Sequence, residues 1–144
     1  MRVVVDTNVA VSGLLWNGPP NQILKWAKTG VLKILACEKT IDELSRVIQY
    51  TRFTKRLSSL GFKTEEIIAY FMNLVFFVPK PQEIPKTIKV DPFDNLFLAL
   101  SAEHKASLLI SGDTHLLSLK EYEQIQIVTP SEACETIQRL FSHF

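Results

Sequence analysis

Short apolar runs alternate along the chain with longer segments in which apolar residues recur at helical spacing. The runs are rich in valine, leucine and isoleucine, which is typical of buried strands. We expect strands at residues 2–5, 31–37, 107–111 and 125–130. We expect helices at residues 20–30, 40–53, 63–78, 91–104, 113–120 and 131–141. This alternation predicts an α/β fold with a mostly parallel central sheet that helices cover on both faces.

Two aspartates stand where expected strands end. Asp6 comes directly after the strand at 2–5, and Asp113 follows the strand at 107–111 after a single glycine. In open α/β sheets, ligands bind outside the carboxyl ends of the strands. We therefore expect both carboxylates at the edge of the sheet that carries the chemistry.

The composition is that of an ordinary globular protein, because 47% of the 144 residues are hydrophobic and 22% are charged. This length suits a single domain over residues 1–144. A net charge of +1 neither favours nor excludes a nucleic-acid partner.

Cys37 and Cys134 lie far apart, without metal-type spacing, which indicates a reducing compartment. The sequence shows no signal peptide and no apolar stretch long enough to span a bilayer, so we expect a cytoplasmic protein without a membrane partner.

Each acidic residue near an expected helix start also has a purely structural interpretation. A role as helix cap or first-turn acid, without any catalytic function, would explain Asp6, Asp91, Asp94 and Asp113. Thr40 and Glu43 match a capping box in which Thr40 is the N-cap residue. Thr64 is the expected N-cap residue of the helix at 63–78.

Together the acids favour a cation site. Carboxylates that converge in a partly dehydrated cleft repel one another, and their pKa values rise. A cluster of three or four is stable only with a cation between them. Because no histidine or cysteine accompanies Asp6, Glu43 or Asp94, the oxygen ligands favour Mg²⁺ or Mn²⁺ over zinc. Such an ion can activate water for attack on a phosphodiester, so no histidine base is required.

Four segments in this order resemble the PIN-domain ribonucleases, and in particular the branch described as toxin components of toxin–antitoxin pairs. The segments are VVVDTNVAVSGLL, IDELSRVI, VDPFDNLFLALSAEHKASLLISGDTHLL and IQIVTPSEA. The resemblance implies a three-layer α/β/α sandwich and Mg²⁺- or Mn²⁺-dependent cleavage of single-stranded RNA. It also implies a homodimer and a cognate antitoxin protein as partners.

The family's metal-binding acids fall on Asp6, Glu43, Asp94 and Asp113. The small polar positions beside them fall on Thr7, Asn8 and Ser111. Of these acids, Asp6 and Asp94 are the expected direct ligands. The other two would complete the negative pocket through waters or around a second ion.

Two of these assignments choose between neighbouring acids. Asp91 lies directly before Pro92 and makes the better N-cap residue, so Asp94 is the preferred ligand and Asp91 an outer one. Glu43 is preferred over Asp42 by the family pattern, since the periodicity alone does not decide between them.

A basic segment follows Glu43, because no acidic residue occurs between it and Glu65. The candidate RNA-binding residues there are Arg46, Arg52, Lys55 and Arg56, with Tyr50 and Phe53 among them. Basic residues with interleaved aromatics are typical of single-strand binding. A solvated helix face with inward-facing aromatics explains the same pattern equally well. We expect Trp16 and Trp26 to be core or interface residues.

The apolar run from Leu74 to Val78 covers too wide an arc for one core face of a helix. Either this end of the helix at 63–78 is wholly buried, or part of it forms a groove for an antitoxin helix or a second copy.

Three other classes fit part of the pattern. A phosphotransferase of the haloacid dehalogenase type needs a second acid two residues after the first, where this chain has Asn8. A receiver-like signalling module needs an acidic pair after the first strand and a late lysine at the cleft, and the pattern offers neither. A non-catalytic PIN-like domain for RNA binding or scaffolding is the remaining alternative, and the presence of all four acids argues against it.

Overall fold

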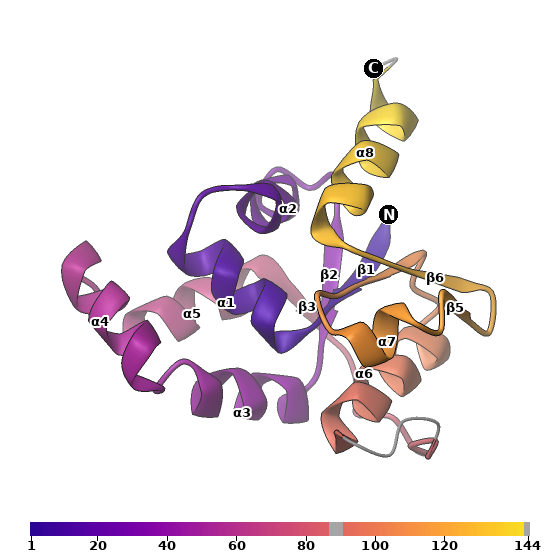
Figure 1. The fold of residues 1–144 in the computed structure, drawn as a ribbon, viewed down its shortest axis with the longest axis horizontal. Coiled ribbons are helices and arrows are strands. Elements are labelled where there is room, and N and C mark those ends of the chain that lie inside the picture. The colour runs from indigo at the N-terminus through magenta and orange to yellow at the C-terminus, as the bar shows by residue number, and fades with distance from the viewer. Residues whose placement is uncertain (87–90, 143–144) are drawn as a thin grey trace.

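A sheet of six strands lies at the centre of the molecule (Figure 1) in a computed structural model that describes residues 1–86 and 91–142. The strands are β1 (Arg2–Val5), β2 (Lys33–Ala36), β3 (Val75–Phe77), β4 (Leu108–Ile110), β5 (Glu121–Tyr122) and β6 (Ile125–Val128). Their order is β3-β2-β1-β4-β6-β5, and all neighbours are parallel except the antiparallel pair β5–β6. The mostly parallel sheet expected from the sequence is therefore confirmed.

Helices occupy most of the connections between the strands. They are α1 (Thr7–Leu15), α2 (Pro19–Lys28), α3 (Glu38–Val47), α4 (Thr51–Leu60), α5 (Thr64–Leu74), α6 (Pro92–Glu103), α7 (Thr114–Leu117) and α8 (Pro130–Phe141). Proline stands in the first turn of α2, α6 and α8, where its missing N–H costs no helical hydrogen bond. No helix within the described residues is long and apolar enough to cross a membrane.

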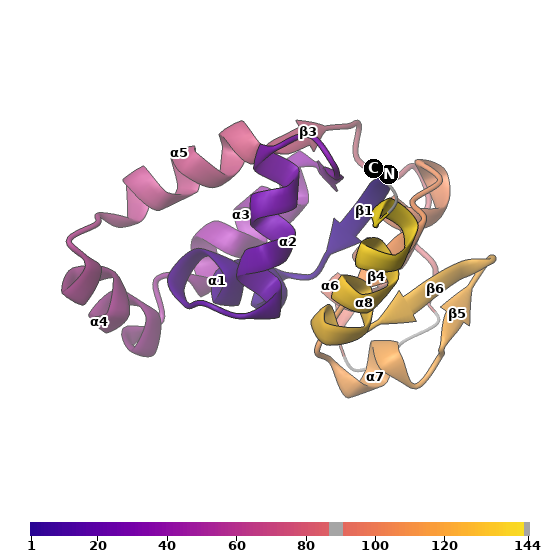
Figure 2. The ribbon, with the colours of Figure 1, turned by 90° about the horizontal axis from the view of Figure 1, so that it is seen from above.

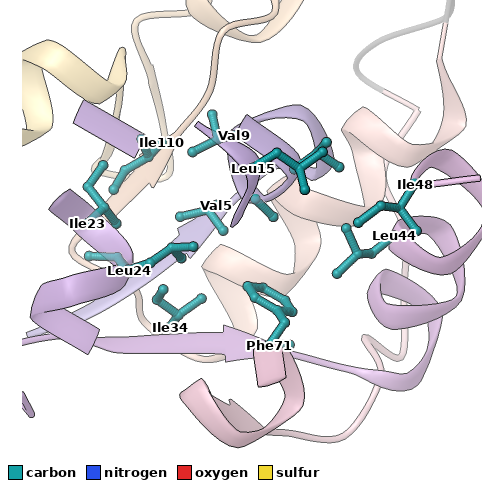
Figure 3. Close-up of a cluster of buried hydrophobic side chains, with 14 of the residues drawn as sticks. Val5, Val9, Leu15, Ile23, Leu24, Ile34, Leu44, Ile48, Phe71 and Ile110 are labelled. Carbon is teal, nitrogen blue, oxygen red and sulfur yellow. The ribbon is translucent and has the colours of Figure 1, made fainter. Parts of the chain in front are cut away.

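Two apolar clusters lie on opposite faces of the sheet. Val3 and Val5 of β1 pack with α1, α2, α3, α5 and α8, while Val4 packs with α6 and Leu116 of α7. Figure 3 shows part of the first cluster, in which side chains of neighbouring strands lie beside those of the covering helices. Figure 2 shows the ribbon of the helices and strands from above. The fold is thus the expected three-layer α/β/α sandwich.

The order in which the chain adds strands to the sheet reverses at β1. After β1 it forms β2 and β3 on one side, and it later returns to place β4 on the other side. Val5 is in register with Ile110, and the Asp6 N–H donates to the Ile110 carbonyl oxygen at 3.0 Å. The carboxyl ends of β1 and β4 therefore meet at a topological switch point, where α/β folds bind ligands.

The helix expected at 40–53 is two helices. The chain is extended at Tyr50, between α3 and α4, and this break lets Phe53 and Leu57 of α4 reach the core beside α1. The N-cap residue of α3 is Cys37, so the assignment of Thr40 was wrong. Thr40 is the N3 residue, and its hydroxyl accepts from the Cys37 N–H at 2.9 Å.

The helix expected at 63–78 ends at Leu74, and residues 75–77 form the edge strand β3, parallel to β2. This explains the wide apolar arc, because side chains of a strand point alternately to two faces. The N-cap residue of α5 is Lys63, whose N–H donates to Glu66 Oε1 at 3.0 Å, so the assignment of Thr64 was also wrong.

Candidate active site

Asp6 lies at the end of β1 and is also the N-cap residue of α1. Its Oδ1 accepts from the Val9 N–H at 2.9 Å, and its Oδ2 accepts a hydrogen bond from the Ser111 hydroxyl. Burial raises the pKa of Asp6, against the hydrogen bonds from Ser111 and Val9, which lower it. Asp6 therefore caps α1 and at the same time presents a buried carboxylate whose orientation is fixed by hydrogen bonds.

Ser111 connects the ends of β1 and β4. It is fully buried, and its Oγ donates to Asp6 while accepting from the Asp113 N–H at 2.9 Å. Asp113 is in turn the N-cap residue of α7, where its Oδ1 accepts from the His115 N–H at 2.7 Å. One hydroxyl therefore fixes the position of two of the predicted site residues.

Asp91 and Asp94 lie in the first turn of α6. Asp91 is the N-cap residue, as expected, and its Oδ1 accepts from the Phe93 N–H at 2.9 Å. Asp94 is buried, and its Oδ2 has no hydrogen-bond partner. Burial, followed by the negative charges of Asp113, Asp91 and Asp6, raises the pKa of Asp94 to about 7.

Glu43 is buried on α3 and forms an ion pair with Arg46 one turn later. Arg46 Nη2 donates to both carboxylate oxygens of Glu43 at 2.9 Å, and its Nε donates to Oε2 at 3.2 Å. Arg46 Nη1 also donates to the Tyr50 hydroxyl oxygen at 2.7 Å. Glu43 thus lies at the site already paired with a side chain that can itself bind a phosphate.

Apart from Ser111, which is buried behind Asp6, these side chains line one cavity of about 220 Å³ at the switch point. All four predicted acids line it, together with Thr7, Asn8, Asp91, Arg46 and Arg52. Asp42 does not line this cavity, in agreement with the preference for Glu43.

Two of the predicted RNA-binding residues, Lys55 and Arg56, are absent from the cavity lining. Arg56 instead donates from Nε to the Leu15 carbonyl oxygen at 2.9 Å, at the end of α1.

The cavity also contains residues that were not assigned to it from the sequence, namely Val47, Tyr50, Phe93 and Phe97. Tyr50 was noted only as an aromatic residue in the basic segment. The i, i+3 spacing of Glu43 and Arg46 is the signal that could have predicted their ion pair. The break at Tyr50, which turns that side chain toward the cavity, has no comparable local signal.

The residues present fit a divalent cation. The clearest sign is Asp94, whose buried Oδ2 has no partner and whose pKa is raised by burial and by three further aspartates, Asp113, Asp91 and Asp6. The Thr7 hydroxyl oxygen, also without a partner, is a second buried oxygen beside them. Within residues 1–86 and 91–142, no group of three or more Asp, Glu, His or Cys side chains is placed so that it could hold a metal ion. The case for a cation therefore rests on unsatisfied charge and an all-oxygen donor set.

The fold and the cavity define an α/β/α protein with a carboxylate-lined pocket at its switch point. The chain belongs to the PIN domain family, whose model matches residues 2–115 and so includes all four acids. PIN domains are usually nucleases, so the function is of the nuclease type.

A solved structure, that of PAE2754 from Pyrobaculum aerophilum, is similar to this chain with a TM-score of 0.60. The likeness covers 96% of this chain and 90% of that one, at 15% sequence identity. At that identity it establishes the fold alone. No curated protein matches the chain.

Proposed function

We propose that this protein is a Mg²⁺- or Mn²⁺-dependent endoribonuclease that cleaves single-stranded RNA. The observation that carries the proposal is the composition of one small cavity. Carboxylates from β1, α3, α6 and the end of β4 converge there, and guanidinium groups of Arg46 and Arg52 lie on its wall. The acids fit a cation that can activate water, and the arginines can bind the phosphate of the substrate. These two features suit the hydrolysis of a phosphodiester.

Asp6 and Asp94 would hold the metal ion, with Asp113 and Glu43 completing the negative pocket. When bound, the ion would supply Lewis-acid activation of water and neutralise charge on the phosphate. Ser111 orients Asp6 through its hydroxyl. Asn8, which lies exposed at the cavity, can donate to a phosphate oxygen, and Asp91 can serve as an outer carboxylate.

Arg46 has to exchange partners in this scheme. In the structure its guanidinium neutralises Glu43, which keeps that carboxylate from a cation. An RNA phosphate offers Arg46 a second anionic partner, because two phosphate oxygens can accept from the guanidinium as the two carboxylate oxygens of Glu43 do. Transfer of Arg46 from Glu43 to phosphate would free Glu43 at the moment when substrate arrives.

We further propose that the protein works in the cytoplasm as the toxin of a toxin–antitoxin pair. This rests on the resemblance of its motifs to that branch of the family. A homodimer is supported by the edge of the sheet, where Phe76 and Phe77 of β3 are both about half exposed, at 52%. An antitoxin helix would have to cover the carboxylate cavity or this apolar edge.

The proposal is tested by incubating the purified protein with single-stranded RNA of random sequence and Mn²⁺, beside a duplex of the same RNA. We expect cleavage of the single strand, no cleavage with EDTA, and a loss of at least roughly 100-fold in Asp94→Asn, since an acid that holds the ion is essential. Asp42→Asn is the matched control, because Asp42 is an exposed acid beside Glu43 but outside the cavity.

Equal cleavage by wild type and Asp94→Asn would refute the proposal. Single-strand binding without any cleavage, over a range of divalent ions, would instead establish the non-catalytic RNA-binding alternative.

A further inference from the structure

Beside the cavity, three aromatic rings and three guanidinium groups form a continuous set of contacts that we call the aromatic–arginine platform. Its members are Trp16, Tyr50, Phe53, Arg46, Arg52 and Arg56. Tyr50 stacks on Phe53 with ring centroids 6.4 Å apart, and Trp16 meets Phe53 edge-on at 6.2 Å. Each guanidinium lies over one ring, at 5.9 Å for Arg46, 4.5 Å for Arg52 and 5.6 Å for Arg56.

The platform has a buried centre and two open ends. Phe53 is 7% exposed and belongs to the core, whereas Tyr50 is 43% exposed and Trp16 is 40% exposed. Phe53 therefore fixes the positions of two rings that remain open to solvent. Of the two aromatics in the basic segment only Phe53 faces inward, and Trp16 is exposed and so is not a core residue.

The platform is continuous with the carboxylate cavity. Arg46, Tyr50 and Arg52 line the cavity, while Arg56 and Trp16 lie beyond it, at the junction of α4 with the end of α1. In Figures 1 and 2, α4 lies at the end of the molecule farthest from α7 and β5. A strand whose phosphate lies in the cavity can thus extend over the platform toward that end.

The chemistry of the platform matches that of a single-stranded nucleic acid. Flat exposed rings can stack with unpaired bases, and guanidinium groups between them can bind the phosphates that join those bases. Arg46 is paired with Glu43, but no acidic residue occurs in the sequence between Glu43 and Glu65, so the neighbouring chain places no carboxylate beside Arg52 or Arg56. An acidic, aromatic protein segment would use some of the same contacts, but it would not need the continuity with the cavity.

We propose that the aromatic–arginine platform binds the nucleotides on one side of the cleaved phosphodiester, with unpaired bases stacked on Tyr50 and Trp16. The inference rests on the proposed nuclease function and adds the means by which single strands are selected. A duplex keeps its bases stacked on each other and cannot offer them to Tyr50 and Trp16. Because every base has a flat face, recognition by the platform tolerates different sequences.

The test is binding of fluorescein-labelled oligo(U) and oligo(A), roughly 12 nucleotides long, in EDTA so that no cleavage occurs. We expect Tyr50→Ala to weaken binding of both about tenfold, the usual effect of losing one stacked base. Arg52→Gln should weaken binding and lower the slope of log affinity against log salt by roughly 0.7.

Matched controls lie elsewhere on the surface. Tyr70 on α5 is 45% exposed and lies outside the platform, so Tyr70→Ala should bind like the wild type. Arg139→Gln, at an exposed arginine of α8, controls for the loss of one positive charge.

A spectroscopic readout detects stacking directly. With Trp26→Phe, Trp16 is the remaining tryptophan of the chain, and saturating oligonucleotide should quench its fluorescence. This signal leaves Trp16 in place and so preserves its contact with Phe53, a core residue of α4.

The outcomes separate the platform from the nuclease. If Tyr50→Ala and Arg52→Gln bind as the wild type does and Trp16 fluorescence is unchanged, or if the wild type binds neither oligonucleotide, the platform is refuted, whatever the cleavage assay shows. If the variants lose affinity and Trp16 is quenched while no metal supports cleavage, the platform stands and the nuclease proposal fails.

Discussion

The carboxylate of Asp94 is buried among other acids with one oxygen unpartnered. Its pKa of about 7 lies above the ordinary value of 3.8, so the folded protein holds a proton that the unfolded chain releases at lower pH. Between these two values the unfolded state binds fewer protons than the folded state. Without a divalent ion, stability should therefore fall as pH rises from about 4 to 7.

The substitution Asp94→Asn should remove most of this decrease in stability between about pH 4 and pH 7. In EDTA at pH 8 we expect the variant to be more stable than the wild type by roughly 1–2 kcal/mol, with the difference vanishing near pH 4. Urea unfolding at the two pH values measures it, with Asp42→Asn as the control. A wild type that is as stable at pH 8 as at pH 5 would contradict the assignment of Asp94 as a destabilising buried acid.

Ser111 acts through its neighbours, since its hydroxyl contacts both Asp6 and the Asp113 N–H. Ser111→Ala should lower Mn²⁺ affinity about 10- to 100-fold, because the carboxylate loses the donor that orients it. Ser111→Thr should restore affinity, as it keeps the hydroxyl. Unchanged affinity in Ser111→Ala, measured by calorimetry, would show that Asp6 is held adequately by the start of α1 alone.

For single residues, the positions of the acids could be predicted from the sequence, because each acid stands at the end of a strand or near the start of an expected helix. The order of Asp6, Glu43, Asp94 and Asp113 in the motifs predicted residues that the structure brings to one cavity. The Glu43–Arg46 ion pair was not predicted, although its i, i+3 spacing was a local signal for it.

At the scale of elements, α1 and α2 approach each other closely at Gly13. A Cβ added there would lie 2.8 Å from the Pro20 carbonyl oxygen and 2.8 Å from Leu24 Cδ1, and the first of these is backbone that cannot move aside cheaply. Asn21 Nδ2 also donates to the Gly13 carbonyl oxygen at 2.8 Å. This contact holds the helix that carries Asp6 at its start.

Gly13→Ala should therefore lower the free energy of unfolding by about 1–3 kcal/mol, the usual cost of overpacking a tight contact. Denaturant unfolding measures the change. Gly112→Ala is the control, because a Cβ there meets nothing within 4 Å and should change stability little. A Gly13→Ala variant as stable as the wild type would show that α1 and α2 can separate freely.

The remaining errors at the element scale have a common cause. Residues 75–77 continue the apolar run of α5, so hydrophobicity alone extends the helix, whereas pairing with β2 decides for a strand. The break before α4 is decided in the same way, by the burial of Phe53 and Leu57 against α1. Tertiary contacts of this kind are not encoded in a local pattern.

For the whole molecule, the α/β alternation was enough to predict three layers and a parallel sheet, since few arrangements bury strands that are apolar on both sides. The edge of that sheet is left with two half-exposed aromatics on β3. An apolar edge strand with unpaired backbone groups is a surface that a second copy can cover. The proposed homodimer would place β3 at its interface.

Phe77→Lys should then weaken self-association by at least roughly tenfold, because a charge on an edge strand opposes pairing. Light scattering over a range of protein concentrations measures this. Leu140→Lys, at an equally exposed apolar residue of α8, is the control. If Leu140→Lys dissociates the protein and Phe77→Lys does not, the interface lies at α8 and not at β3.

The central claim is that the acids of the cavity form one metal site, and calorimetric titration of Mn²⁺ into the purified protein tests it most directly. The measurement needs no guess about the RNA. We predict that the wild type binds Mn²⁺, that Asp6→Asn and Asp94→Asn each lose at least roughly tenfold in affinity while remaining folded, and that Asp42→Asn binds normally. If both cavity variants bind Mn²⁺ as the wild type does, the carboxylates are helix caps and first-turn acids, and the metal site does not exist.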